Sequence, residues 1–255
     1  MTTPFVAVAG ATGALGRLVA LEHRNLNTHV KALVRPGTEP SRVAELQKSG
    51  VTITPVKLSD VETQTTELQG ATCVMSVLQG SRRDAWSARQ SVGRSSCSKV
   101  PRFLPSDFSL DLAKTEPGSN RNLDLRRDIL NGGFMDLLGG DTPLLNHYWR
   151  RIPYVGSADQ LLDFTTMKDV AIYTAAVALD TGPTPKILRI AGDVVSMRGV
   201  AEAASEVEEQ RVQYMELIFP GDGKLEPLDK GRYPGVKWTG VVDFLRQSKE
   251  EQSDN

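Results

Sequence analysis

The sequence predicts an α/β fold built on a doubly wound parallel sheet. An unbroken apolar run at residues 5–9 is short enough for a buried strand and is followed directly by Gly10-x-x-Gly13-x-x-Gly16. Segments typical of strands and of helices then alternate along the chain, which is the pattern of a parallel sheet with crossover helices. With 40% hydrophobic and 24% charged residues, the chain has the composition of a globular protein that can bury a core.

The elements of this pattern follow one another at short intervals. Strands are expected at residues 5–9, 28–34, 51–56, 73–78, 102–104, 129–131 and 186–191. Helices are expected from about residue 14 and at residues 41–49, about 120–128 and 197–209. Two crossovers fit poorly, because residues 81–99 lack an apolar stripe at helical spacing and residues 105–128 leave little room for a loop and a helix.

We interpret residues 1–255 as one domain with a small C-terminal elaboration. Two segments rich in Gly and Pro, roughly 131–163 and 210–240, would form a cap on the side of the sheet where ligands bind. The last residues, 248–255, are polar and are expected to fray.

Composition and charge exclude several classes of function. The formal net charge of -1 gives no general attraction to nucleic acid or to an acidic membrane. The two cysteines and three histidines are scattered, which argues against a disulfide framework and against a metal site. The chain also lacks a basic, apolar leader and an apolar run of membrane-spanning length, so we expect a cytoplasmic protein.

The glycine motif predicts a dinucleotide site. One glycine makes the tight turn after the strand, one lets the backbone approach a pyrophosphate, and one lets the helix pack closely. A tight turn without a ligand is the alternative. At the end of the second strand, where NAD-binding folds place an acidic residue, this chain has Arg35, so NADP(H) is favoured over NAD(H).

Three other assignments near this loop stay open. Arg35 could be an ordinary surface arginine, and Arg17 is a second candidate for the same phosphate. Asp60, after the third strand, is placed either to meet the adenine edge or to cap the next helix.

Five motifs together resemble the NmrA-like branch of the atypical short-chain dehydrogenases, with its isoflavone reductase relatives. They are VAGATGALG, LVRPG, RFLPSDFSLD at residues 102–111, ILNGGFMD at residues 129–136 and DFTTMKDVA at residues 163–171. The resemblance covers the chain to about Gly192 and, more loosely, KLEPLDKGRYPGVKWT. It implies a Rossmann-like domain that binds NADP(H) and a small C-terminal substrate domain.

The resemblance also implies roles for particular residues. The pyrophosphate would lie along Gly10, Thr12, Gly13, Leu15 and Gly16, and Arg35 would take the 2′-phosphate. Ser76, Val77 and Leu78 would border the adenosine ribose and the nicotinamide side, and Pro105, Ser106, Asp107 and Phe108 would line the nicotinamide pocket. Residues 131–134, with Asn131 and Gly132 first, would close over the ring.

The chain departs from its relatives at the proton donor. The reductases carry a lysine on the helix after the PSDF-type motif, whereas this segment has Arg121, Arg126 and Arg127, which keep their protons at biological pH. Lys114 comes too early in the sequence, and four of the five tyrosines lack a lysine four residues later; Tyr233 has Lys237 at that spacing. His147 lies in the expected cap, where a surface or packing role is the alternative to substrate contact. No catalytic residue is assigned.

Three functions are compatible with these residues. The first is an NADP(H)-dependent oxidoreductase that transfers a hydride to a small organic carbonyl, quinone or enone. The second is a non-catalytic NADP(H)-binding sensor or regulatory protein, which the absence of the relatives' lysine favours. The third is a nonfunctional variant whose irregular crossovers impair folding. A small-molecule substrate is expected, while its identity and the oligomeric state are not predicted.

Overall fold

The structure is a computed structural model that divides into two compact units. It describes residues 3–57, 59–78, 100–106, 108, 128–139, 144–145, 151–154, 156–208, 213–216 and 229–253. The first unit comprises Met1–Asp107, Arg126–Asp128 and Val170–Lys186, and the second comprises Phe108–Leu125, Ile129–Asp169 and Ile187–Asn255. The predictions for residues 81–99, Lys114, Arg121, Arg126, Arg127 and His147 lie outside the described residues.

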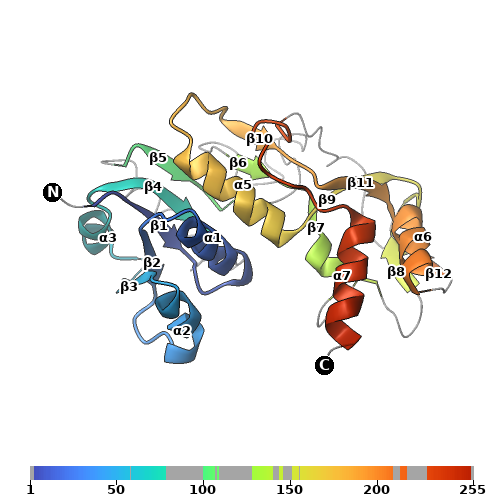
Figure 1. The fold of residues 1–255 in the computed structure, drawn as a ribbon, viewed down its shortest axis with the longest axis horizontal. Helices are drawn as coiled ribbons and strands as arrows, with labels where there is room; N and C mark the ends of the chain where they lie inside the picture. The colour runs from blue at the N-terminus through green and yellow to red at the C-terminus, as the bar shows by residue number, and fades with distance from the viewer. Residues whose placement is uncertain are drawn as a thin grey trace. The chain divides into compact units, whose positions relative to one another are not determined.

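A five-stranded parallel sheet forms the first unit, in the order β3-β2-β1-β4-β5. Its strands, coloured from blue to green in Figure 1, are β1 (Phe5–Ala9), β2 (Val30–Val34), β3 (Thr52–Pro55), β4 (Ala71–Ser76) and β5 (Arg102–Leu104). All five residues of β1 are buried, as its continuous apolar sequence requires for the central strand. The predicted parallel sheet is therefore confirmed.

The helices of the first unit are α1 (Ala14–Asn25), α2 (Pro40–Lys48), α3 (Val61–Glu67) and most of α5 (Met167–Leu179). Pro40 begins α2, where its missing N–H costs nothing. Asp60 caps α3: its carboxylate accepts the backbone N–H of Thr63 at 3.0 Å and the Thr63 hydroxyl at 2.6 Å. Of the two roles considered for Asp60, the structure therefore supports the helix cap.

Apolar side chains from strands and connecting segments fill the core of the first unit. A cluster of buried residues joins them: Phe5, Ala7, Ala9, Leu33, Val56, Leu68, Ala71 and Val74. The guanidinium of Arg102 on β5 donates to the carbonyl oxygens of Val177 and, at 3.3 Å, Gly182. These bonds join the fifth strand to the segment that returns from residue 170.

Small sheets and two helices form the second unit. Its strands are β6 (Asp128–Leu130), β7 (Gly133–Phe134), β8 (Arg151–Tyr154), β9 (Leu161–Thr165), β10 (Ile187–Arg189), β11 (Asp193–Ser196) and β12 (Gln213–Glu216). They pair as β10-β6, β11-β9-β7 and β12-β8. A 3-10 turn (Met135–Leu138) and the helices α6 (Met197–Glu208) and α7 (Val241–Ser253) complete it. The strands expected at residues 129–131 and 186–191 thus pair with each other instead of extending the parallel sheet.

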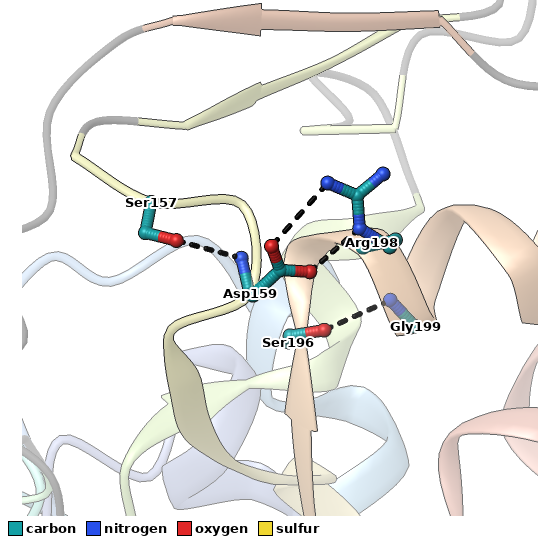
Figure 2. Close-up of polar contacts among 5 residues, drawn as sticks. All are labelled: Ser157, Asp159, Ser196, Arg198 and Gly199. Atoms are coloured by element: carbon teal, nitrogen blue, oxygen red, sulfur yellow. Dashed lines mark hydrogen bonds and ion pairs between the residues drawn. The ribbon is translucent and has the colours of Figure 1, made fainter.

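Charged and hydroxyl side chains fix the start of α6. Figure 2 shows the Asp159 carboxylate facing the Arg198 guanidinium, with contacts of 2.6 and 3.4 Å. The Ser157 hydroxyl accepts the Asp159 N–H, and the Ser196 hydroxyl accepts the Gly199 N–H at 3.0 Å. Because Arg198 places a positive charge in the first turn, where the helix dipole is unfavourable to cations, Asp159 compensates it.

The expected frayed tail is wrong for residues 248–253. Helix α7 continues to Ser253, although its last turns are polar. Val241 and Leu245 on its first turns are buried in the second core cluster, together with Val200 and Ala204 of α6. The packing of its first half stabilises α7, and the polar residues that follow extend the helix from this packed half.

Candidate functional site

Backbone packing explains two of the three glycines after β1. Gly10 has φ +91°, and a Cβ there would lie 2.4 Å from the Val77 carbonyl oxygen. A Cβ at Gly16 would lie 2.2 Å from the Gly10 carbonyl oxygen. Any side chain at either position would therefore displace neighbouring backbone. These two glycines are required by the fold itself, whether or not a ligand binds.

Gly13 is different, because nothing in the folded chain excludes a side chain there. It is exposed, its φ is -88°, and a Cβ would meet only the Gly10 carbonyl oxygen, at 3.4 Å. Its N–H donates to that oxygen at 3.0 Å, which closes the turn. The fold would tolerate a side chain at position 13, yet the sequence has glycine there. This combination fits a ligand that approaches the backbone closely.

Helix α1 starts at this loop without a side-chain cap. Gly13 is its N-cap residue, no side chain accepts from the first turn, and the first turn carries no acidic residue. The N–H groups at such a start, together with the helix dipole, favour an anion. The loop therefore fits the diphosphate of a dinucleotide in shape and in charge.

The two arginines predicted to take the 2′-phosphate lie in the elements that follow the loop. Arg35 follows β2 in a turn where its carbonyl oxygen accepts the Thr38 hydroxyl at 2.6 Å, and its exposed side chain has no partner among the described residues. Arg17 is engaged, because its Nη1 contacts Glu45 Oε2 at 2.6 Å. The two candidates differ in the structure, because Arg35 has no partner among the described residues whereas Arg17 is in an exposed ion pair; which of them meets a phosphate stays a prediction.

Arg42 is a residue that the sequence analysis missed. Its Nη2 donates to the Thr12 carbonyl oxygen at 3.4 Å, which brings a third guanidinium to the glycine loop. The position of Arg42 in the first turn of a helix could be predicted from the sequence. Its contact with the glycine loop could not, because that contact depends on how α2 packs.

The ends of β4 and β5 meet beside the loop. Val77 donates its N–H to the Ala9 carbonyl oxygen at 2.7 Å, which continues the β1–β4 pairing past Ser76. The Ser76 and Ser106 hydroxyl oxygens lie 2.7 Å apart, and Ser106 also accepts the Leu78 N–H at 2.8 Å. Ser76, Val77, Leu78, Pro105 and Ser106, which were predicted separately, therefore lie in one cluster at the carboxyl edge of the sheet.

Asn131 and Gly132 form a buried junction in the second unit. The Thr165 hydroxyl donates to the Asn131 carbonyl oxygen at 2.6 Å and lies 3.3 Å from the Gly192 N–H, which joins three segments. Gly132 has φ +70°, and a Cβ there would lie 2.2 Å from the Asp163 carbonyl oxygen. Packing accounts for Gly132, and its role beside a nicotinamide ring stays a prediction.

Two buried titratable groups of the first unit have strongly shifted pKa values. Burial raises the pKa of the Cys73 thiol to about 12 and lowers the pKa of His23 to about 4, so both are neutral at pH 7. In the described part of the chain, no three His, Cys, Asp or Glu residues are grouped so that they could hold a metal ion. None of the helices described there is long and apolar enough to span a membrane.

Comparison with known families finds similarity over the segment that contains the glycine loop. A profile of the NmrA-like family matches residues 2–121. Residues 2–121, just under half of the chain, are therefore similar to the NmrA-like family. An isoflavone reductase homologue from Zea mays is 36% identical over 115 residues, which cover 43% of this chain and 37% of the maize protein. The match thus spans well under half the length of this curated relative.

Solved structures extend the similarity beyond the NmrA-like segment. AtPrR2 with NADP+ and (+)-pinoresinol has a TM-score of 0.76 at 16% identity, covering 97% of this chain and 99% of that one. A leucoanthocyanidin reductase from Vitis vinifera with NADPH has a TM-score of 0.76 at 17% identity, covering 96% and 99%. An isoflavone reductase has a TM-score of 0.74 at 17% identity, covering 97% and 100%. At these identities the similarity establishes the α/β, Rossmann-like fold.

Proposed function

We propose that this chain is an NADP(H)-dependent oxidoreductase that reduces a small organic carbonyl, quinone or enone. One observation carries the proposal: the exposed Arg35 guanidinium, which has no partner among the described residues, follows β2 at the same sheet edge as the uncapped start of α1. A helix start suits a diphosphate, and an arginine beyond the neighbouring strand suits the 2′-phosphate that distinguishes NADP(H). Relatives solved with NADP+ or NADPH support the same cofactor.

The residues of the first unit have distinct proposed roles. The backbone N–H groups at the start of α1 hold the diphosphate, with Gly13 giving the room for it. Arg35 pairs with the 2′-phosphate, and Arg42, fixed on the Thr12 carbonyl, adds positive charge there. Bound NADPH would supply the hydride. Segments 131–163 and 210–240 are proposed to select the substrate.

A sensor that binds NADP(H) without turnover is the second candidate. The observation that favours it lies in the sequence, which has no lysine in the helix expected at residues 120–128. The Tyr-x-x-x-Lys spacing that the sequence does contain, Tyr233 to Lys237, lies outside any helix of the structure. Both candidates require the cofactor and differ only in whether a substrate is reduced.

The first experiment titrates NADPH and NADH into the wild type, Arg35→Glu and Arg17→Ala by calorimetry. We expect the wild type to favour NADPH by about 10- to 100-fold, the worth of charge-assisted hydrogen bonds to one phosphate. Arg35→Glu removes this preference, and Arg17→Ala keeps it, because Arg17 is paired with Glu45. If the wild type binds neither nucleotide, both candidates are refuted. A screen of carbonyl, quinone and enone acceptors with NADPH then separates the enzyme from the sensor.

A further inference from the structure

Two serines from different strands share a hydrogen bond at the carboxyl edge of the parallel sheet. Ser76 is the last residue of β4, and Ser106 comes two residues after β5 ends. Their hydroxyl oxygens lie 2.7 Å apart, and the Leu78 N–H donates to the Ser106 oxygen at 2.8 Å. The distance alone does not say which hydroxyl is the donor.

Burial decides the direction of this hydrogen bond. Ser76 is 1% exposed, and within the described chain Ser106 is the partner of its hydroxyl. If Ser106 gave its proton to Ser76, the Ser76 proton would be buried without an acceptor, which is costly. If Ser76 donates, the Ser106 oxygen accepts from Ser76 and from Leu78, and the Ser106 proton points away from both. Ser106 is only partly buried, so this proton is open to a ligand.

Sheet order indicates which part of a dinucleotide would meet this proton. The strands run β3-β2-β1-β4-β5, so Arg35 after β2 and Ser106 after β5 lie on opposite sides of the loop after β1. A dinucleotide with its diphosphate at the loop and its 2′-phosphate at Arg35 therefore extends its nicotinamide half over β4 and β5. That half offers the ribose oxygens and the carboxamide oxygen as neutral acceptors. The carboxamide oxygen is the strongest acceptor among them, which suits a neutral hydroxyl donor.

We propose that Ser106 donates a hydrogen bond to the carboxamide oxygen of the nicotinamide, and that Ser76 is a positioning residue that orients the Ser106 hydroxyl. This inference rests on the proposed NADP(H) binding and goes beyond it by assigning one atom-to-atom contact. The two bonds that Ser106 accepts polarise its O–H group and strengthen it as a donor.

The test compares NADP+ with its thionicotinamide analogue, in which sulfur, a weak acceptor, replaces the carboxamide oxygen. Dissociation constants are measured by calorimetry for the wild type, Ser106→Ala, Ser106→Thr and Ser76→Ala, and thermal unfolding shows that each variant is folded. The quantity compared is the preference for NADP+ over the thionicotinamide analogue, given by the ratio of their dissociation constants. We expect this preference to be about 5-fold larger in the wild type than in Ser106→Ala, which corresponds to one neutral hydrogen bond. Ser106→Thr keeps the hydroxyl and the preference.

The Ser76 variant tests the direction of the bond. Ser76→Ala removes a bond that Ser106 accepts and leaves the Ser106 proton in place, so the preference is expected to stay or to fall. A rise would mean that Ser106 gives its proton to Ser76 in the wild type, and would overturn the assignment. An unchanged preference in folded Ser106→Ala would also overturn it while leaving NADP(H) binding intact. Absence of NADP+ binding by the wild type would instead refute the proposed function, and this inference with it.

Discussion

Gly13 should accept a serine in the folded protein but not in the cofactor complex. Its φ of -88° and ψ of 166° are open to any residue, and the position caps α1. Serine is a favourable N-cap residue, so we expect Gly13→Ser to leave the free energy of unfolding unchanged or to raise it by up to about 1 kcal/mol. The hydroxymethyl group would stand where the diphosphate approaches, and NADPH affinity is expected to fall at least about 10-fold.

Gly16→Ala is the matched control within the same motif. A Cβ there would lie 2.2 Å from the Gly10 carbonyl oxygen, well inside the 3.0 Å below which something must shift. Moving α1 away from the strand is expected to cost about 2–3 kcal/mol, the usual range for overpacking. At roughly 2–4 °C per kcal/mol, the melting temperature would fall by roughly 4–12 °C.

Calorimetric titration with NADPH and urea unfolding measure the two effects separately. The reasoning requires that Gly13→Ser lose affinity without losing stability, and that Gly16→Ala lose stability. Wild-type NADPH affinity in Gly13→Ser would refute a ligand-based reason for Gly13. A strongly destabilised Gly13→Ser would show that the fold already requires this glycine.

Three further predictions concern charge. Burial lowers the pKa of His23 to about 4, so between pH 6.5 and 4 this histidine is protonated in the unfolded chain but stays neutral in the folded chain. The free energy of unfolding should therefore fall by about 3 kcal/mol over this pH range. Urea unfolding of His23→Leu should not show this fall. The pKa of Asp159 is lowered, mainly by its hydrogen bond from Arg198, so its contribution is present above its unfolded pKa of 3.8 and disappears as the pH falls. Asp159→Asn should therefore be less stable than the wild type at pH 7 and should match it near pH 2 in the same assay. Arg42→Ala should weaken NADPH binding several-fold in calorimetry with little change for NADH, since the lost charge acts on the 2′-phosphate; equal losses for both nucleotides would place Arg42 elsewhere.

The sequence was most informative where burial is continuous. Strand β1 is apolar throughout and buried throughout, so its position and its burial followed from five letters. The glycines marked the turn, and Arg35 after β2 is exposed in the structure and has no partner in the described part of the chain. These features depend on neighbours in sequence or on one strand end, which a linear pattern records.

Contacts between segments that are distant in the sequence could not be predicted from the sequence. The Ser76–Ser106 bond spans 30 residues, and the Arg42 contact with Thr12 depends on how α2 packs. The sheets of the second unit have strands of two to five residues, too short for a clear alternation of apolar and polar positions. Asp60 could be a cap or a ligand contact on sequence grounds, and only the two bonds with Thr63 distinguish the roles.

The return of the chain to the first unit limits how the protein can be dissected. The segment Val170–Lys186 belongs with the parallel sheet, and Arg102 on β5 holds two of its carbonyl oxygens. A fragment ending at residue 121, where the family match stops, would lack this helix and leave buried apolar surface uncovered. Truncation at a single position cannot give either unit complete, so a truncated protein should aggregate. A circular permutant that keeps residues 170–186 is the better route to an isolated cofactor domain.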